Sequence, residues 1–153
     1  MTQGSIYFVE RFEYEDGGES TDKLLIVLYI DNVKSIVIRA LPTSQQKIPN
    51  SILNNGCTNN DMFSFFMFGM GIVVGVKNDG SPFSFEKNTF VFVRDNVNTM
   101  SISDLTKYQG GRIRLIANLN PDKFERLIKC VKKSKHLKNR VKKAFEDHNL
   151  NTK

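Results

Sequence analysis

The stretch Leu24-Leu-Ile-Val-Leu-Tyr-Ile30 decides the fold, because it is a continuous apolar run bounded by the polar pairs Asp22-Lys23 and Asp31-Asn32. The run is too short for a typical helix, and valine, isoleucine and tyrosine are residues that favour strands. We therefore expect a central β-strand.

Two further strands are predicted on either side of this run. Residues 6–12 mix aromatic and β-branched residues with charges, which is typical of a half-buried strand, and Gly17-Gly18 marks a loop after it. Asp31-Asn32 can turn the chain into a strand over 35–41, which Pro42 ends because proline lacks an amide donor. The N-terminal third is therefore predicted to form three consecutive antiparallel strands.

The middle of the chain carries weaker signals. Residues 45–61 are rich in Asn, Ser and Gly and are predicted to be a loop, whereas the apolar residues 63–76 predict one strand with a bulge or a sharp bend at its glycines. Asn78-Asp79-Gly80 is a strong hairpin signal, and residues 89–93 predict another strand. The phenylalanines of 63–68 could stack on bases, but packing in a core or a dimer is the favoured interpretation.

Helices are predicted only in the last third. Ser101 and Asp104 have capping-box spacing for a short helix through 107, and residues 112–116 predict a last strand. Asn120 and Pro121 are a typical helix start, and apolar residues at helical spacing follow. Leu137, with Val141 and Phe145 after it, predicts a second, basic helix. The expected fold class is α+β, mainly β, with antiparallel strands, a short helix and C-terminal helices.

The length and charge of the chain limit the classes of function. With 153 residues the chain is expected to be one domain, 1–153, with a basic helical extension from about 134. The formal net charge of +6 and a pI near 9.4 favour polyanionic partners. Acidic residues crowd positions 13–22 and basic ones crowd 129–143, so the two regions carry opposite fields.

Neither a membrane nor a cofactor is expected. No apolar run reaches the roughly 18 residues that span a bilayer, and the start lacks a secretory pattern, so we expect a cytoplasmic protein. Cys57 and Cys130 lack metal-ligand spacing and are expected to be reduced in that compartment. The chain also lacks the common nucleotide-binding and hydrolase motifs, and His136 and His148 are interpreted as surface residues.

The order of several segments resembles the MazF/PemK-like toxins of bacterial toxin-antitoxin pairs. The matching segments are Gly4-Ser-Ile-Tyr-Phe-Val9, Lys23-Leu-Leu-Ile-Val-Leu28, Ala40-Leu-Pro-Thr-Ser44, Lys47-Ile-Pro49, Thr89-Phe-Val-Phe-Val-Arg-Asp-Asn-Val-Asn-Thr-Met100 and the Gly-Arg start of the last strand. The resemblance covers most of residues 4–133. It implies an SH3-like small barrel, a homodimer, metal-independent endoribonuclease activity on single-stranded RNA, and neutralisation by an antitoxin.

The resemblance also implies which residues act. An arginine before the second strand and a threonine or serine after the third support attack by the ribose 2′-hydroxyl in that family; these positions correspond here to Lys23 and to Thr43 with Ser44 beside it. Such groups would orient the phosphate and stabilise developing charge. Lysine cannot clamp a phosphate bidentately as arginine can. Without the resemblance, the favoured interpretation is that Lys23 is a solvated surface charge and that Thr43 and Ser44 form a turn.

Four further cations complete the sequence-based hypothesis. Arginine and lysine pair with phosphate, and arginine also stacks on bases, so these side chains are candidates for RNA binding. They are Arg39, Lys47, Arg94 and Arg112. The alternative hypothesis is a non-catalytic module of the same fold, which would bind nucleic acid without cutting it or would inhibit a protein partner, as CcdB-like toxins do.

Overall fold

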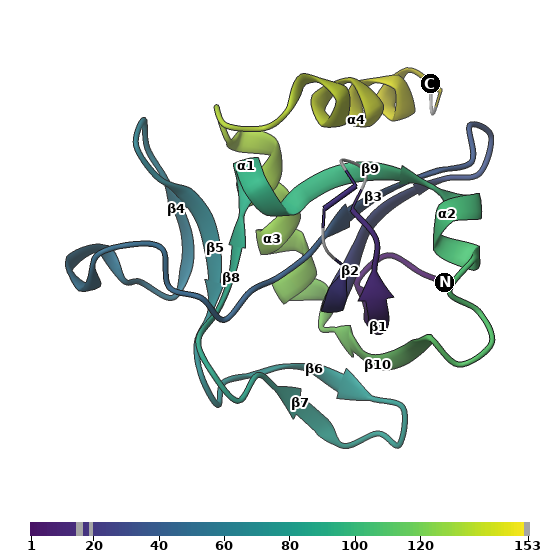
Figure 1. The fold of residues 1–153 in the computed structure, drawn as a ribbon. Helices are drawn as coiled ribbons and strands as arrows, with labels where there is room; N and C mark the ends of the chain where they lie inside the picture. The colour runs from purple at the N-terminus through teal and green to yellow at the C-terminus, as the bar shows by residue number, and fades with distance from the viewer. Residues whose placement is uncertain (15–16, 19, 152–153) are drawn as a thin grey trace.

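The computed structural model describes residues 1–14, 17–18 and 20–151, with side chains as far as Glu146. Within these residues the chain is a mixed α+β protein, mainly β, built on antiparallel sheets (Figure 1). Three acidic residues of the predicted acidic loop, Glu15, Asp16 and Glu19, and the side chain of His148 lie outside the described part.

The strands form two sheets. The strands of the larger sheet are β1 (Ser5–Phe12), β2 (Thr21–Asp31), β3 (Ile36–Ala40), β6 (Val73–Lys77), β7 (Pro82–Ser84), β9 (Val97–Ser101) and β10 (Ile113–Leu119). They pair in the order β7-β6-β10-β1-β2-β3-β9. The smaller sheet contains β4 (Gly56–Asn59), β5 (Ser64–Phe68) and β8 (Thr89–Phe92), in the order β4-β5-β8. An isolated bridge between Thr43 and Phe90 links the segment after β3 to β8.

The helices lie mostly in the second half of the chain. They are the 3₁₀ turn η1 (Asn50–Ile52), the short helices α1 (Val93–Asn96) and α2 (Ile102–Thr106), and the longer helices α3 (Pro121–Lys133) and α4 (Asn139–Asn151). In Figure 1, α4 crosses the top of the molecule, the smaller sheet stands at the left, and the β6–β7 hairpin lies at the bottom. Helix α3 contacts β4 and β5 of the smaller sheet.

Strand β2 is the centre of the fold because both of its faces are apolar. Ile26 and Leu28 join a core cluster that includes side chains of α3 and α4. Leu25 and Val27 point the other way, into a second cluster around the buried Tyr108. Burying each such side chain contributes about 1.5–3 kcal/mol, so β2 alone anchors two cores.

Most of the predicted elements are confirmed. The three consecutive strands are β1, β2 and β3, paired antiparallel. The hairpin at Asn78-Asp79-Gly80 joins β6 to β7. Ser101 caps α2 by accepting a hydrogen bond from the Asp104 amide at 3.0 Å, and α3 begins at Pro121.

Two predictions for the middle of the chain are wrong. Residues 63–76 form two strands, β5 and β6, which belong to different sheets. The chain turns between them at Gly71, whose φ of 74° favours glycine, and the Ile72 amide donates to the Gly69 carbonyl at 3.2 Å. The predicted loop over 45–61 contains η1 and strand β4.

The expectation of two reduced cysteines is also wrong. Cys57 of β4 and Cys130 of α3 form a disulfide, with their Cα atoms 5.7 Å apart and a sequence separation of 73. Cys57 is exposed, whereas Cys130 is buried. The bond therefore ties the outer strand of the smaller sheet to the long helix beside it.

Strand pairing in the described part of the chain yields two open sheets and no closed barrel. Strands β7 and β9 form the edges of the larger sheet. No helix in the described residues is both long and apolar enough to cross a membrane.

Candidate nucleic-acid interface

Two of the predicted RNA-binding cations meet in one surface pocket beside the smaller sheet. This Lys47–Arg94 pocket has a volume of about 220 Å³ and is lined by Lys47, Ile48, Met62, Phe63, Ser64, Phe65, Phe92, Arg94, Asp95 and His136. The lining residues come from the segment before η1, from the start of β5, from the junction of β8 and α1, and from the link between α3 and α4. Four segments that are distant in sequence thus converge.

The cations reach the pocket from different elements. Lys47 is exposed, and its Nζ lies 5.8 Å from the centroid of the Phe92 ring, where the ring face attracts a positive charge. Arg94 is exposed on α1, beside the carboxylate of Asp95. The pocket therefore carries two permanent positive charges and one negative charge, a balance that favours an anion.

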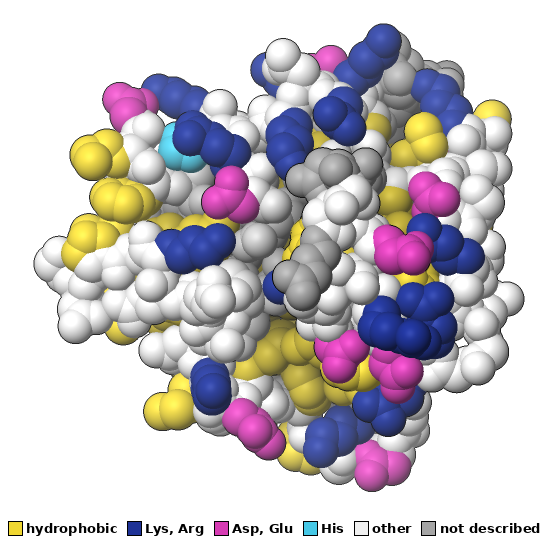
Figure 2. Space-filling view, in the orientation of Figure 1, with side chains coloured by type: hydrophobic (Ala, Val, Ile, Leu, Met, Phe, Trp, Pro, Cys, Tyr) yellow, Lys and Arg dark blue, Asp and Glu magenta, His cyan; other side chains and the backbone are white. Residues whose placement is uncertain are grey.

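His136 is the residue that the sequence analysis missed. It is half-buried and lines the pocket, and its Nε2 lies 3.0 Å from the carbonyl oxygen of Asp61. A carbonyl oxygen only accepts, so Nε2 carries a hydrogen, and Nδ1 is the acceptor in the neutral ring. Figure 2 shows a cyan histidine side chain beside dark blue Lys and Arg side chains at the upper left.

The phenylalanines of residues 63–68 divide between core and pocket. Phe66 and Phe68 belong to the main core, and Phe65 is completely buried against Phe90 and Phe92, so packing is the role of these three rings. Phe63, just before β5, is half-buried and lines the pocket, and Met62 beside it is 78% exposed. Phe63 is the phenylalanine of 63–68 that remains available for a flat ligand.

Lys23, Thr43 and Ser44 lie outside this pocket. Lys23 is half-buried on β2, opposite Val9 of β1. The Thr43 backbone pairs with Phe90 in both directions, at 2.9 and 2.7 Å, and its hydroxyl accepts a hydrogen bond from the Gln45 amide at 3.1 Å. This is the turn-forming geometry that the simpler interpretation predicts. Ser44 is exposed.

The hairpin register nevertheless relates Lys23 to Thr43. Ile26 lies opposite Ala40 in the antiparallel β2–β3 pairing. Lys23 lies three residues before Ile26 (26 − 3 = 23), and Thr43 lies three residues after Ala40, beyond the end of β3 (40 + 3 = 43). Both residues therefore lie at the same end of the hairpin. Beyond Ala40, however, the chain leaves β2 to pair with β8 through Thr43.

Arg39 and Arg112 make internal contacts. Arg39 is only 2% exposed, its Nη1 donates to the Asn96 carbonyl at 2.9 Å, and its guanidinium lies 5.5 Å from the Phe12 ring centroid. Arg112 lies 4.9 Å from the ring of Tyr108, and its Nη2 donates to the carbonyls of Glu10 and Arg11. Arg39 thus offers no surface to RNA, and Arg112 holds the end of β1.

No cluster of three or more His, Cys, Asp or Glu side chains within the described residues could hold a metal ion. The Lys47–Arg94 pocket presents two cations, one carboxylate, one imidazole and aromatic rings. No protein-family model matches this chain, and no curated protein matches it either.

Proposed function

We propose that this protein binds single-stranded RNA in the Lys47–Arg94 pocket. The observation that carries the proposal is the convergence of Lys47, Arg94 and His136 around Phe63 at one surface pocket. Single-stranded nucleic acids are recognised by cations that contact phosphates and by aromatic rings that stack on bases. A pocket with both features suits a nucleotide within a strand better than it suits an isolated phosphate.

We extend the proposal to cleavage, on the strength of the resemblance to the MazF/PemK-like toxins. In this view the ribose 2′-oxygen attacks the adjacent phosphorus without a metal, the bond from phosphorus to the 5′-oxygen of the next nucleotide breaks, and the proton of the 2′-hydroxyl passes through solvent to that leaving oxygen. Lys23 stabilises charge on the phosphate, and Thr43 or Ser44 assists the proton transfer or positions the phosphate. The shared hairpin end of Lys23 and Thr43 supports this assignment. The turn hydrogen bond at the Thr43 hydroxyl counts against it.

The toxin hypothesis carries further expectations about architecture and partners. It includes an SH3-like barrel related to the β1-β2-β3 core, a homodimer, a cytoplasmic site of action and a cognate antitoxin. The net charge of +6 supports an acidic antitoxin as well as RNA. The alternative, a module that binds RNA without cutting it, is favoured by the absence of Lys23 and Thr43 from the lining of the pocket that collects the other cations.

RNA binding is tested with a fluorescent single-stranded RNA of ten nucleotides in EDTA, titrated at several salt concentrations. Lys47→Ala and Arg94→Ala should each weaken binding several-fold, and each should lower the slope of log Kd against log salt by about 0.7 for one lost phosphate contact. Lys87→Ala is the matched control, because Lys87 is exposed and lies outside the pocket. Equal losses in all three variants would reject the site.

Cleavage is tested on a long single-stranded RNA in EDTA, with mapping of the cut ends. Lys23→Ala or Thr43→Ala should slow discrete cuts about 100- to 1000-fold while leaving binding of the short RNA intact. His136→Gln in the same assay separates the two regions: if it alone abolishes cutting, the reaction takes place in the pocket. Intact RNA with normal binding would establish the non-catalytic module.

A further inference from the structure

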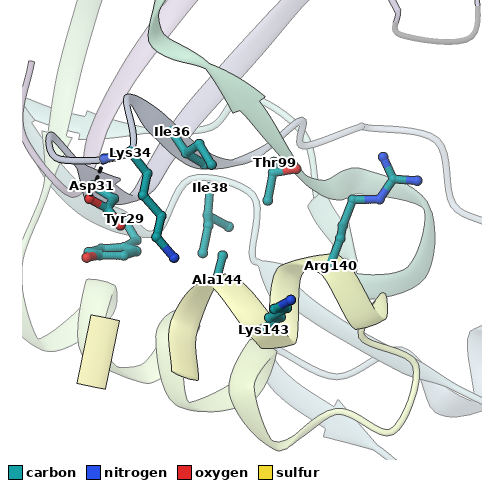
Figure 3. A pocket seen from close by; sticks show the side chains of 9 residues that line it. All are labelled: Tyr29, Asp31, Lys34, Ile36, Ile38, Thr99, Arg140, Lys143 and Ala144. Atoms are coloured by element: carbon teal, nitrogen blue, oxygen red, sulfur yellow. Dashed lines mark hydrogen bonds between the residues drawn. The ribbon is translucent and has the colours of Figure 1, made fainter. Parts of the chain in front are cut away.

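A second pocket lies on a different part of the molecule, between the β2–β3 hairpin, β9 and helix α4. This Arg140–Lys143 pocket has a volume of about 220 Å³ and is lined by Tyr29, Asp31, Lys34, Ile36, Ile38, Thr99, Arg140, Lys143 and Ala144 (Figure 3). It shares no lining residue with the Lys47–Arg94 pocket. The RNA hypothesis therefore gives it no role.

The floor of this pocket is apolar. Ile38 is fully buried in the main core, and Ile36 and Ala144 are half-buried beside it. Figure 3 shows the side chain of Ile38 between the β3 strand and Ala144 on α4. The wall is held by Tyr29, whose ring stacks on Phe145 of α4 with centroids 6.1 Å apart. Ile36 and Ala144 thus offer aliphatic surface to a compact apolar group, with Ile38 packed beneath them.

The rim of the pocket is positively charged. Arg140 and Lys143 are exposed on α4, and Lys34 comes from the β2–β3 turn, so three cations face one carboxylate, that of Asp31. The Asp31 Oδ1 already accepts hydrogen bonds from the backbone amides of Val33 and Lys34, at 3.0 and 3.1 Å. Among the described side chains, no acidic group pairs with Arg140 or Lys143.

The two remaining polar side chains of the lining, Thr99 and Tyr29, add no negative charge. Burial, and then the neighbouring Asp31 carboxylate, raise the pKa of the Tyr29 phenol above its ordinary value of 10.0. The phenol therefore stays neutral at physiological pH. The surplus of positive charge around the apolar floor is retained.

We propose that the Arg140–Lys143 pocket binds a small amphipathic anion, namely a compact aromatic or branched aliphatic body that carries one carboxylate. A closed apolar cavity of about 150 Å³ can hold a benzene ring, so a pocket of about 220 Å³ accommodates a ring with a short side chain. The apolar body lies on Ile36 and Ala144, and the carboxylate meets Arg140 and Lys143. Arginine pairs with carboxylate through two parallel hydrogen bonds, which gives the site a preference for this anion.

The test uses indole-3-acetate and its neutral amide, indole-3-acetamide, as probes that differ in charge but hardly in shape. Both are titrated into protein with ¹³C-labelled Ile and Ala methyl groups and followed by NMR. Indole-3-acetate should shift the methyl signals of Ile36, Ile38 and Ala144 with a Kd on the order of 0.1–1 mM, and the amide should bind at least about fivefold more weakly. Absence of shifts at these methyl groups, or equal affinity of the two probes, overturns the proposal.

Three variants sharpen the test. Arg140→Ala and Lys143→Ala should each lower the affinity for indole-3-acetate by about three- to tenfold and leave the affinity for indole-3-acetamide unchanged. Ala144→Phe should fill the pocket and abolish binding of both probes. Lys142→Ala is the matched control, because Lys142 is exposed on the same helix but does not line the pocket. An equal loss with Lys142→Ala shows a general charge effect and rejects the site.

Inorganic phosphate is the last probe. It tests whether the apolar floor contributes, because phosphate carries charge without an apolar body. Phosphate should bind at least about tenfold more weakly than indole-3-acetate. Equal affinity would mean an unspecific anion site of the kind that RNA phosphates also occupy, and would overturn the proposed ligand class.

Discussion

The central strand of the larger sheet and the outer strand of the smaller sheet are held in place by different contacts. Strand β2 of the larger sheet buries alternate side chains in two apolar clusters, and its neighbours β1 and β3 directly precede and follow it in sequence. Strand β4 of the smaller sheet has no buried residue. It is held by its pairing to β5, by the Cys57–Cys130 disulfide and by a hydrogen bond from Asn59 Nδ2 to the Cys130 carbonyl at 3.0 Å.

The larger sheet and the outer strand β4 therefore depend on different kinds of contact. Non-directional burial fixes the larger sheet, whereas a covalent bond and a few directional contacts fix the outer strand of the smaller one. The Lys47–Arg94 pocket is lined by Phe63, just before β5, and by the start of β5, a strand whose residues are all buried. Strand β4, which supplies no residue to the Lys47–Arg94 pocket, should therefore loosen before the buried strands.

The largest expected effect is a cavity in the larger sheet. Ile26 is completely buried in the main core, so Ile26→Ala should lower the free energy of unfolding by about 2–5 kcal/mol, and both sheets should unfold together. Urea denaturation followed by far-UV circular dichroism measures the loss. Val33→Ala is the control, because Val33 is 89% exposed and its loss should stay below about 0.5 kcal/mol. Similar losses in both variants would contradict the burial argument.

The next effect is confined to the smaller sheet. The disulfide closes a loop with a sequence separation of 73, for which the chain-entropy account gives about 4 kcal/mol, and measured losses are often smaller. Cys57→Ser should speed hydrogen exchange in β4 and β5 and leave β1 and β2 nearly unchanged. A reducing agent should change the wild type in the same way and should not change the variant further. Equally faster hydrogen exchange in all four strands would contradict the prediction that the disulfide acts mainly on β4 and β5.

A smaller loss of stability is expected when one hydrogen bond beside the larger sheet is removed. The Glu13 amide donates to the hydroxyl of the buried Tyr108 at 2.8 Å. Tyr108→Phe keeps the ring that stacks on Phe12 but removes this acceptor, so it should cost about 1 kcal/mol. Chemical denaturation measures the loss. A loss above about 3 kcal/mol would mean that the ring itself has moved.

The smallest effect depends on pH. The hydrogen bond from Lys107, 2.7 Å from Glu13, lowers the pKa of Glu13 below its ordinary value of 4.5, so the folded chain binds this proton less readily than the unfolded chain. The ion pair therefore stabilises the fold above that pH, and its contribution is lost as the pH falls through the folded pKa. Melting temperatures of the wild type and Lys107→Met should converge between about pH 5 and about pH 3. Parallel curves would contradict the pairing.

The sequence predicts the elements whose signals are local. The apolar run of β2, the glycine turn at 78–80 and the serine cap of α2 each fix a structure within a few residues. Strand β4 lies in an Asn- and Gly-rich segment without periodicity, and it forms because β5 offers an edge and Cys57 meets Cys130. Such tertiary contacts leave no local pattern, so the smaller sheet and its disulfide were not predicted.

The candidate site is divided in the same way. Lys47 and Arg94 could be predicted as RNA-binding residues from their residue type. Their proximity to His136 depends on how the α3–α4 link packs against β5. Arg39 was predicted by the same criterion, but it is buried, because its side chain points toward the face of the sheet that packs against Phe12. Charge type is visible in a sequence, whereas the side of the strand on which a charge emerges depends on register.

The position of β1 between β2 and β10 has a consequence for how the chain is made. Ser5 lies opposite Asn118, which is 118 − 5 = 113 residues later in the chain. At a synthesis rate of about 5–20 residues per second, the first strand waits roughly 6–23 s for its second neighbour. During that time the β1-β2-β3 hairpins present an unpaired apolar edge, which is a template for association with other nascent chains. We therefore expect this edge of newly made molecules to be open to association until β10 has been synthesised.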